Sequence, residues 1–105
     1  MMRLLERPRR ILAYREPVDM RNGFKGLYAL TLQGLGEDPL SGDLFVFINK
    51  ERSYMKCLLW DRTGLVLMSK RLERGKFSAP LSSALVCELD ERQFSLLFDG
   101  VKICY

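Results

Sequence analysis

The sequence predicts an α+β fold, in which a small antiparallel β-meander packs against one amphipathic helix and is followed by a short C-terminal helix. Three consecutive apolar runs separated by short polar turns, between residues 44 and 70, predict the meander. Apolar residues at helical spacing between residues 20 and 35 predict the first helix. With 105 residues, 48% of them hydrophobic, the chain can form one domain with a modest core. We expect that domain to span residues 10–105 after a flexible basic arm of residues 1–9.

The first predicted elements are a short strand and the amphipathic helix. Residues 11–14 form an apolar run that ends before Pro17, and Asp19 is positioned to cap a following helix. One stripe of that helix is formed by Met20, Phe24, Leu27, Thr31 and Leu35. We expect Phe24 and Leu27 to pack onto the sheet, Arg21 to lie on the opposite side, and Gly34 and Gly36 to end the helix.

The central runs predict strands at residues 44–48, 53–60 and 65–70, joined by turns at residues 49–52 and 61–64. Direct closure of both hairpins predicts four facing pairs: Val46 with Met55, Phe45 with Lys56, Leu58 with Leu67, and Tyr54 with Arg71.

The two faces of this meander differ in chemistry because side chains alternate along a strand. The face that we expect to form the core against the helix holds Leu44, Val46, Ile48, Met55, Cys57, Leu59, Val66 and Met68. The other face mixes aromatic and basic residues with apolar ones: Phe45, Phe47, Tyr54, Lys56, Leu58, Trp60, Leu65, Leu67, Ser69 and Arg71.

The C-terminal part predicts one more strand and one more helix. Residues 81–89 form a weaker apolar run. Asp90 and Gln93 have the spacing of a capping box, and an apolar stripe from Phe94 to Val101 continues to a stop near Gly100.

Positive charge is concentrated in two stretches of the chain. The net charge is +4 overall, with seven basic and three acidic residues in positions 1–36 and eight basic and three acidic residues in positions 44–77. This distribution favours an anionic partner such as nucleic acid, although a solvated surface gives the same pattern.

Cysteine usage and the termini indicate a cytoplasmic protein without a membrane segment. Cys57, Cys87 and Cys104 are widely spaced, and the chain has no histidine, so a zinc site is not expected. Cys57 and Cys87 lie in apolar runs and are predicted to be reduced core thiols. The sequence has no signal-peptide pattern and no apolar run long enough to span a bilayer.

The sequence does not predict an enzyme. Turns and caps explain most of the acidic residues that could form a metal-binding triad: Asp19, Asp38, Asp43, Asp61, Glu73, Asp90 and Asp99. No histidine is present to act as a base. We therefore expect no catalytic residue, metal, cofactor or small-molecule substrate.

The aromatic and basic face is one candidate binding surface. Phe45, Phe47, Tyr54 and Trp60 are suited to stacking on exposed bases while Lys56 contacts phosphate. The same aromatics suit a protein interface. In a third interpretation a helix, such as residues 90–99, covers them and makes them core.

The second candidate is the basic tail that follows the last central strand. Lys70, Arg71, Arg74 and Lys76 can each neutralise a phosphate, and Gly75 lets the backbone approach a nucleic acid closely. Together with Lys56 and Arg21 they form the predicted nucleic-acid-binding set. The alternative is a solvated loop in which Glu73 pairs with Arg71 or Arg74.

Three blocks of sequence, at residues 19–27 (DMRNGFKGL), 38–47 (DPLSGDLFVF) and 55–77, carry a family resemblance. In this order they resemble the TnpB-type accessory protein, the second open reading frame product of insertion sequence 66 elements. The resemblance implies a non-catalytic helper that works beside a separate, larger transposase. Our leading hypothesis is a DNA-binding factor that helps the transposase engage element ends. The alternative is a protein–protein adaptor that does not bind DNA.

Overall fold

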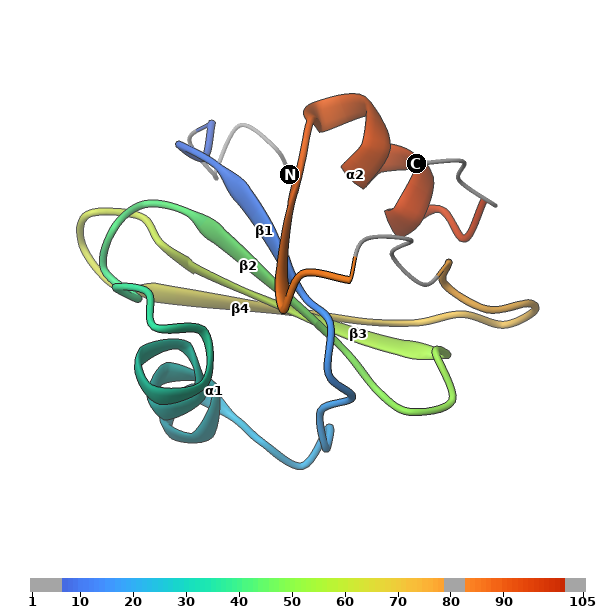
Figure 1. Ribbon diagram of the computed structural model, residues 1–105, viewed down its shortest axis with the longest axis horizontal. Coiled ribbons are helices and arrows are strands. Elements are labelled where there is room, and N and C mark those ends of the chain that lie inside the picture. The colour runs from blue at the N-terminus through green and yellow to red at the C-terminus, as the bar shows by residue number, and fades with distance from the viewer. Residues whose placement is uncertain (1–6, 79–82, 102–105) are drawn as a thin grey trace.

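A five-stranded sheet forms the centre of the protein, with one helical element on each of its faces (Figure 1). The computed structural model describes residues 7–78 and 83–101. Along the chain the elements are β1 (Ile11–Tyr14), α1 (Phe24–Leu30), the π-helical turn η1 (Thr31–Leu35), β2 (Leu44–Ile48), β3 (Tyr54–Trp60), β4 (Leu65–Arg71), β5 (Val86–Leu89) and α2 (Glu91–Phe98). The predicted α+β class is confirmed.

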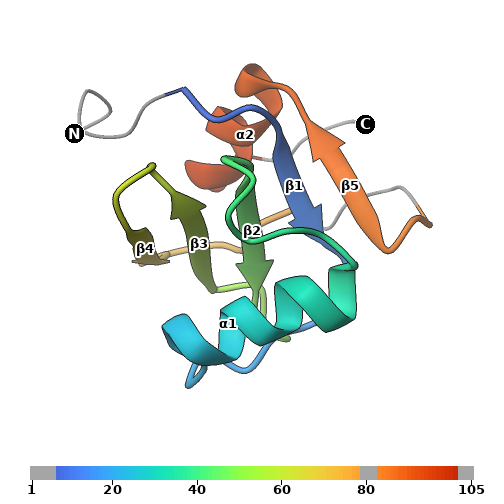
Figure 2. The same cartoon turned by 90° about the vertical axis from the view of Figure 1, so that its left-hand side faces the viewer.

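The sheet contains the predicted meander but is mixed rather than wholly antiparallel. Its strand order is β4-β3-β2-β1-β5. β2, β3 and β4 pair antiparallel as predicted, whereas β1 runs parallel to β2 and pairs antiparallel with β5 (Figure 2). The parallel pair requires a long crossover, which α1 and η1 provide.

The second predicted hairpin register is confirmed and the first is wrong by two residues. Leu58 faces Leu67 and Tyr54 faces Arg71, but Val46 faces Cys57 instead of Met55. The β2–β3 turn is longer than expected, because Asn49 Oδ1 accepts hydrogen bonds from the backbone N–H groups of Ser53 and Tyr54. A shift of two residues keeps every side chain on its predicted face.

Helix α1 begins at Phe24, four residues later than predicted, and Gly23 rather than Asp19 is its N-cap. The Asp19 carboxylate instead binds the backbone N–H and the guanidinium of Arg21 in the preceding turn. Gly26 allows a close approach there, since a Cβ on it would lie 2.1 Å from Asn22 Oδ1. The predicted stop is confirmed at Gly36, which is left-handed with φ of 67°.

The two sheet faces are covered by the opposite helices from those predicted. α1 and η1 contribute Leu27 and Leu35 to a core with Phe45, Phe47 and Leu58. The face that carries Val46, Met55, Cys57 and Leu59 instead packs with Phe77 and with Leu97 of α2. Both faces are apolar enough to be core, so the alternating pattern alone does not decide which helix covers which face.

Phe24 does not belong to the core, contrary to expectation. Its side chain is 50% exposed, whereas Leu27, one turn later in α1, is fully buried. The late start of α1 leaves Phe24 at the first position of the helix, away from the sheet. Truncation of Phe24 is therefore not expected to cost the stability that loss of a core aromatic would.

The C-terminal elements and the cysteines largely agree with the sequence. The capping box is present, because Asp90 Oδ1 accepts from the Gln93 backbone N–H and Gln93 Oε1 accepts from the Asp90 backbone N–H. Cys57 is buried as a free thiol, and burial raises its pKa to about 12. Cys87 is also a free thiol but only half-buried. Cys104, residues 1–6 of the predicted arm and the first residues of the predicted strand at 81–89 lie outside the described residues.

Candidate nucleic-acid interface

Two segments that are about twenty residues apart in sequence meet at one end of the sheet. The backbone N–H of Leu72 donates to the carbonyl of Ser53 at 2.9 Å, and that of Phe77 donates to the carbonyl of Arg52 at 2.7 Å. Phe77 is fully buried in the core below α2 and anchors the second segment. The β2–β3 turn and the chain after β4 therefore lie side by side at one end of the sheet (Figure 1).

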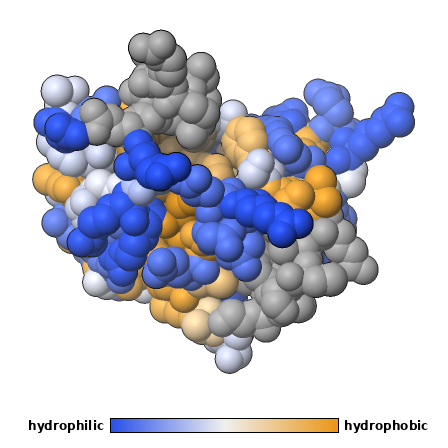
Figure 3. Space-filling model, turned by 90° about the horizontal axis from the view of Figure 1, so that it is seen from above, coloured by the Kyte–Doolittle hydropathy of each residue, from blue (hydrophilic) through white to orange (hydrophobic). Residues whose placement is uncertain are grey.

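Five cations gather on these two segments, and we call them the basic tip: Lys50, Arg52, Arg71, Arg74 and Lys76. Four of them are exposed and Arg52 is half-buried. Within residues 7–78 and 83–101, none of the five forms an ion pair with a carboxylate. From above, hydrophilic side chains extend outward at the end of the molecule where Figure 1 places the chain after β4 (Figure 3). This end of the protein therefore presents positive charge that is not held in ion pairs among the described residues.

Glu73, which lies within the same segment, forms no ion pair with the tip cations in the described part of the chain. The sequence left open a solvated loop in which Glu73 pairs with Arg71 or Arg74, but Glu73 is exposed and pairs with no described cation. Arg71 instead lies over the ring of Tyr54, its facing residue on β3, with 5.3 Å between its Cζ and the ring centroid. This contact orients the Arg71 guanidinium without using its charge in an ion pair.

A small hollow of about 110 Å³ extends the basic tip toward the end of β1. Its lining includes Arg15, Lys50 and Arg52 and no carboxylate. The guanidinium of Arg15 donates to the carbonyl of Ser83 and is thereby held in place. Arg15 was not predicted as a site residue, because the sequence does not show that the end of β1 adjoins the β2–β3 turn.

Lys70 belongs to the predicted binding set, but the structure gives it a different role. Its Nζ donates to the carbonyl of Phe98, lies 3.9 Å from the Phe98 ring centroid and lies 3.9 Å from Asp99 Oδ1. A cation at this place satisfies a carbonyl at the C-terminus of α2 and complements the helix dipole. Lys70 therefore holds α2 on the sheet, and we remove it from the candidate interface.

Lys56 and Arg21 also have partners within the protein. Lys56 Nζ donates to the carbonyl of Asn22 at 2.8 Å, so this half-buried lysine ties the loop before α1 to β3. Arg21 is exposed and pairs with Asp19 at 2.6 Å, and the hydrogen bond from Arg21 lowers the pKa of Asp19 to about 2. Neither residue is brought to the basic tip.

The four residues of the predicted stacking surface do not form one exposed surface. Phe45 and Phe47 are fully buried under α1, so the prediction that they stack on bases is wrong. A helix does cover them, as one interpretation allowed, but it is α1 rather than residues 90–99. Tyr54 and Trp60 are half-buried at opposite ends of β3, about 20 Å apart at the usual rise of a strand.

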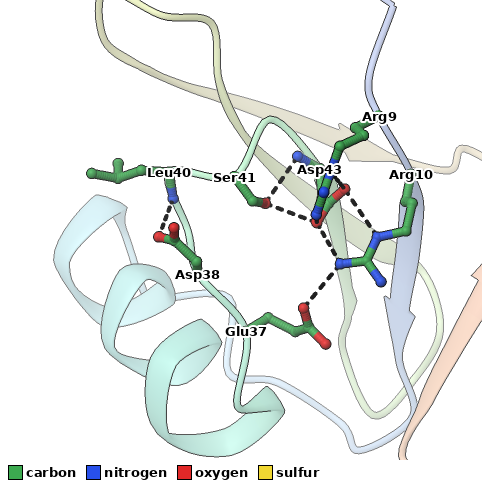
Figure 4. A network of polar contacts seen from close by, with 7 residues as sticks. All are labelled: Arg9, Arg10, Glu37, Asp38, Leu40, Ser41 and Asp43. Atoms are coloured by element: carbon green, nitrogen blue, oxygen red, sulfur yellow. Dashed lines mark hydrogen bonds and ion pairs between the residues drawn. The ribbon is translucent and has the colours of Figure 1, made fainter.

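A buried polar network lies at the other end of the sheet, where β1 and β2 begin (Figure 4). The Asp43 carboxylate, which is fully buried, is 2.8 Å from Arg10 Nη2, 3.2 Å from Arg9 Nη2 and 2.8 Å from Ser41 Oγ. Arg10 also pairs with Glu37 at 3.0 Å. Burial alone would raise the pKa of Asp43, but hydrogen bonds from Arg10, Arg9 and Ser41 outweigh burial and lower it to about 2.

The sequence did not predict this arginine network, because Asp43 was assigned to a turn. The available signal is positional: Arg10 directly precedes β1, Asp43 directly precedes β2, and Ile11 pairs with Leu44. That signal becomes informative only when β1 is known to run parallel to β2. Arg9, the last residue of the predicted flexible arm, is thereby attached to the domain.

Other carboxylates have structural roles in their own turns. Asp61 Oδ1 accepts from the backbone N–H groups of Thr63 and Gly64, and Asp38 Oδ1 accepts from that of Leu40. Over the described ranges, no group of three or more His, Cys, Asp or Glu side chains could hold a metal ion. No helix in the same part of the chain is long and apolar enough to cross a membrane.

Comparisons with known proteins agree with the resemblance carried by the sequence. A family model described as IS66 Orf2 like protein matches residues 9–104. Uncharacterized protein y4jC of Sinorhizobium fredii (strain NBRC 101917 / NGR234) is 40% identical over 92 residues, which cover 88% of this chain and 79% of that protein. Uncharacterized protein y4hO of the same strain is 36% identical over 83 residues, which cover 79% of this chain and 72% of that protein. No solved structure matches the chain significantly.

Proposed function

The chain belongs to the IS66 Orf2-like family, and from this premise we propose that it is a non-catalytic accessory protein of transposition that binds DNA through the basic tip. In this role it assists a separate transposase at the ends of the element. Since its partners are then DNA and the transposase, it acts in the cytoplasm.

The observation that carries the proposal is the unpaired charge of the basic tip. Four other arginines, including Arg10 and Arg21, have carboxylate partners, but the five tip cations have none among the described residues. Lys and Arg side chains of this kind neutralise DNA phosphates and release counterions, which is the main source of affinity for DNA. Gly75, left-handed with φ of 74°, adds a point where a sugar-phosphate chain can approach the backbone closely.

Two further features support a binding role rather than a catalytic one. Asp43, Asp61 and Asp90 are each engaged by donors of the protein itself, in the arginine network, a turn and a helix cap. The two tip segments are also held by backbone hydrogen bonds and by the buried Phe77, so their cations project from a fixed platform. A fixed platform reduces the ordering cost of binding.

Fluorescence anisotropy with a labelled DNA duplex tests the proposal. Arg71→Ala combined with Arg74→Ala should weaken binding to every duplex sequence alike, because phosphate contacts carry no sequence information. The control is Lys25→Ala combined with Arg92→Ala, which removes the same charge from exposed positions on α1 and α2. Equal affinities for the two double variants would exclude the basic tip as the DNA site.

A second candidate function, a protein adaptor for the transposase, is favoured by one observation. Phe24 and Leu32, on α1 and η1, are large apolar side chains that are 50% and 48% exposed. Apolar side chains on an outer helical surface are suited to a protein contact.

The adaptor function is tested by co-purification with the transposase of the same element. Phe24→Ser combined with Leu32→Ser should abolish co-purification if this surface is the contact, while DNA binding through the basic tip persists. Co-purification that survives this double variant would contradict the assignment of the adaptor contact to α1 and η1.

A further inference from the structure

Trp60 lies beside a hollow at the opposite end of β3 from the basic tip. The hollow has a volume of about 480 Å³ and is lined by three segments: the chain before β1, the turn before β2, and the end of β3 with the turn that follows it. Sites for small ligands typically have volumes of roughly 300 to 1,000 Å³. We call this feature the Trp60 hollow; it is large enough for one nucleotide.

Trp60 is an aromatic residue that lies outside both core clusters. Its neighbours Leu58 and Leu59 are buried in the two core clusters, one on each side of the sheet, whereas Trp60 is half-buried and belongs to neither cluster. Leu40, which also lines the hollow, is 42% exposed. The indole and Leu40 therefore provide apolar surface that can contact a planar ligand.

Cations line the hollow beside this apolar surface, and the nearby carboxylates accept hydrogen bonds from the protein itself. Arg7, Arg9 and Arg62 line the hollow. Asp43, the partner of Arg9, is fully buried in the arginine network. The carboxylate of Asp61, which also lines the hollow, accepts three hydrogen bonds of 3.0 Å from its own turn. An incoming anion would therefore meet the guanidinium groups that line the hollow, with Asp61 Oδ1 already engaged by its own turn.

The Arg7 guanidinium can exchange its present partner for another anion. It pairs with Glu91 at 2.8 Å, and the two side chains are 80% and 63% exposed. Such exposed ion pairs are weak, because water screens both charges. A phosphate in the Trp60 hollow could replace Glu91 at little cost.

The backbone beside the Trp60 hollow is strained at Arg62. Arg62 has a φ of 84°, in the left-handed region that L-residues with long side chains rarely adopt. Backbone strain of this kind destabilises the fold locally and concentrates at binding and catalytic sites. The strained turn places Arg62 at the rim of the Trp60 hollow.

From these observations we propose that the Trp60 hollow binds one unpaired nucleotide of single-stranded DNA, with the base stacked on Trp60 and the phosphate held by Arg62 and Arg7. This site deepens the proposed function and rests on it, since both take DNA as the ligand. It differs in chemistry from the basic tip, because stacking requires a base outside the duplex whereas the tip requires only phosphates. One molecule would then hold a duplex at one end and an unpaired strand at the other.

The single tryptophan of the chain makes the test direct, because all tryptophan fluorescence comes from Trp60. Titration with an eight-residue oligothymidylate should quench this fluorescence with saturation, and a blunt duplex should not. Arg62→Asn should weaken the oligothymidylate titration, because asparagine tolerates a left-handed backbone but carries no charge. Lys25→Gln removes one charge outside the hollow and should leave the titration unchanged.

A labelled oligothymidylate extends the test to Trp60 itself. Trp60→Ala should weaken its binding by about 5- to 150-fold, as expected for loss of one stacked base. Blunt-duplex binding should remain, which also shows that the variant is folded.

The outcomes separate this site from the proposed function. Oligothymidylate that leaves Trp60 fluorescence unchanged, while duplex binding through the basic tip is intact, would overturn the nucleotide site alone. Failure of both DNA forms to bind would overturn the site and the proposed function together. Quenching by a glutamate-rich peptide but not by oligothymidylate would assign the hollow to an acidic protein segment and overturn the nucleotide proposal.

Discussion

The arginine network and the basic tip lie at opposite ends of the same sheet and use arginine in opposite ways. In the network, Arg9 and Arg10 share the buried carboxylate of Asp43, and Arg10 also binds Glu37. In the basic tip, Arg71 and Arg74 are exposed and have no carboxylate partner among the described residues. The first arrangement fixes where β1 and β2 begin, and the second leaves charge available for an anion.

The difference between these regions shows that the number of cations in a stretch does not reveal their role. Residues 7–10 and residues 70–76 are both rich in cations. Only the fold shows that a carboxylate is buried beside the first group, or that Lys70 in the second group binds the end of α2. Loss of the ion pairs of Asp43 should therefore affect stability, whereas removal of the tip cations should affect duplex binding.

The largest effect on stability is expected from Asp43→Ala. This change leaves Arg10 without its buried partner, and breaking such a pair typically costs about 3 to 5 kcal/mol. Because Arg10 retains Glu37 and is partly exposed, we expect a loss near 3 kcal/mol in the free energy of unfolding measured with urea.

Glu73→Ala is the matched control, because Glu73 is an exposed acid without an ion-pair partner in the described part of the chain. Its effect on the free energy of unfolding should stay within about 0.5 kcal/mol. Equal urea midpoints for the Asp43 and Glu73 variants would show that the arginine network does not stabilise the fold.

Acid should weaken the network in a defined pH range. The pKa of Asp43 is about 2 in the folded protein, below the ordinary value of 3.8, so the unfolded chain takes up this proton first as pH falls. The contribution of Asp43 is thus fully present above about pH 4 and is lost between there and pH 2. Urea unfolding from pH 5 to pH 2 should show a steeper decline for the parent protein than for Asp43→Ala; parallel declines would contradict this.

At the basic tip, removal of charge should hardly change the stability of the fold. Arg71→Ala combined with Arg74→Ala removes no ion pair among the described residues, and the contact of Arg71 with Tyr54 is worth roughly 0.5 to 1 kcal/mol at an exposed site. We expect a thermal midpoint within a few degrees of the parent protein. A drop as large as that of Asp43→Ala would mean that the tip cations support the fold, as those of the network do.

The sequence predicted most elements of this fold, because each depends on local patterns. The alternating runs of β2 to β4, the capping box of Asp90 and the stop at Gly36 are all set by neighbouring residues. Which helix covers which face of the sheet could not be predicted from neighbouring residues. Both faces are apolar, so the packing of Phe47 under α1 depends on the crossover from β1 to β2 rather than on any local pattern.

The candidate site also combines residues that are neighbours in sequence with residues from distant segments, and only the first kind could be predicted. Arg71, Arg74 and Lys76 were predicted because they follow one another along the chain. Lys50, Arg52 and Arg15 join them only through contacts between distant segments, and Lys70 leaves the set for the same reason.

The central claim is that the tip cations, which have no ion-pair partner among the described residues, contact DNA phosphates. The salt dependence of duplex binding tests this claim most directly. For the parent protein, the logarithm of affinity should fall linearly with the logarithm of salt concentration. In Arg71→Ala with Arg74→Ala, the magnitude of this slope should decrease by about 1.8, which corresponds to the loss of two phosphate contacts. An unchanged slope in this double variant would contradict the claim.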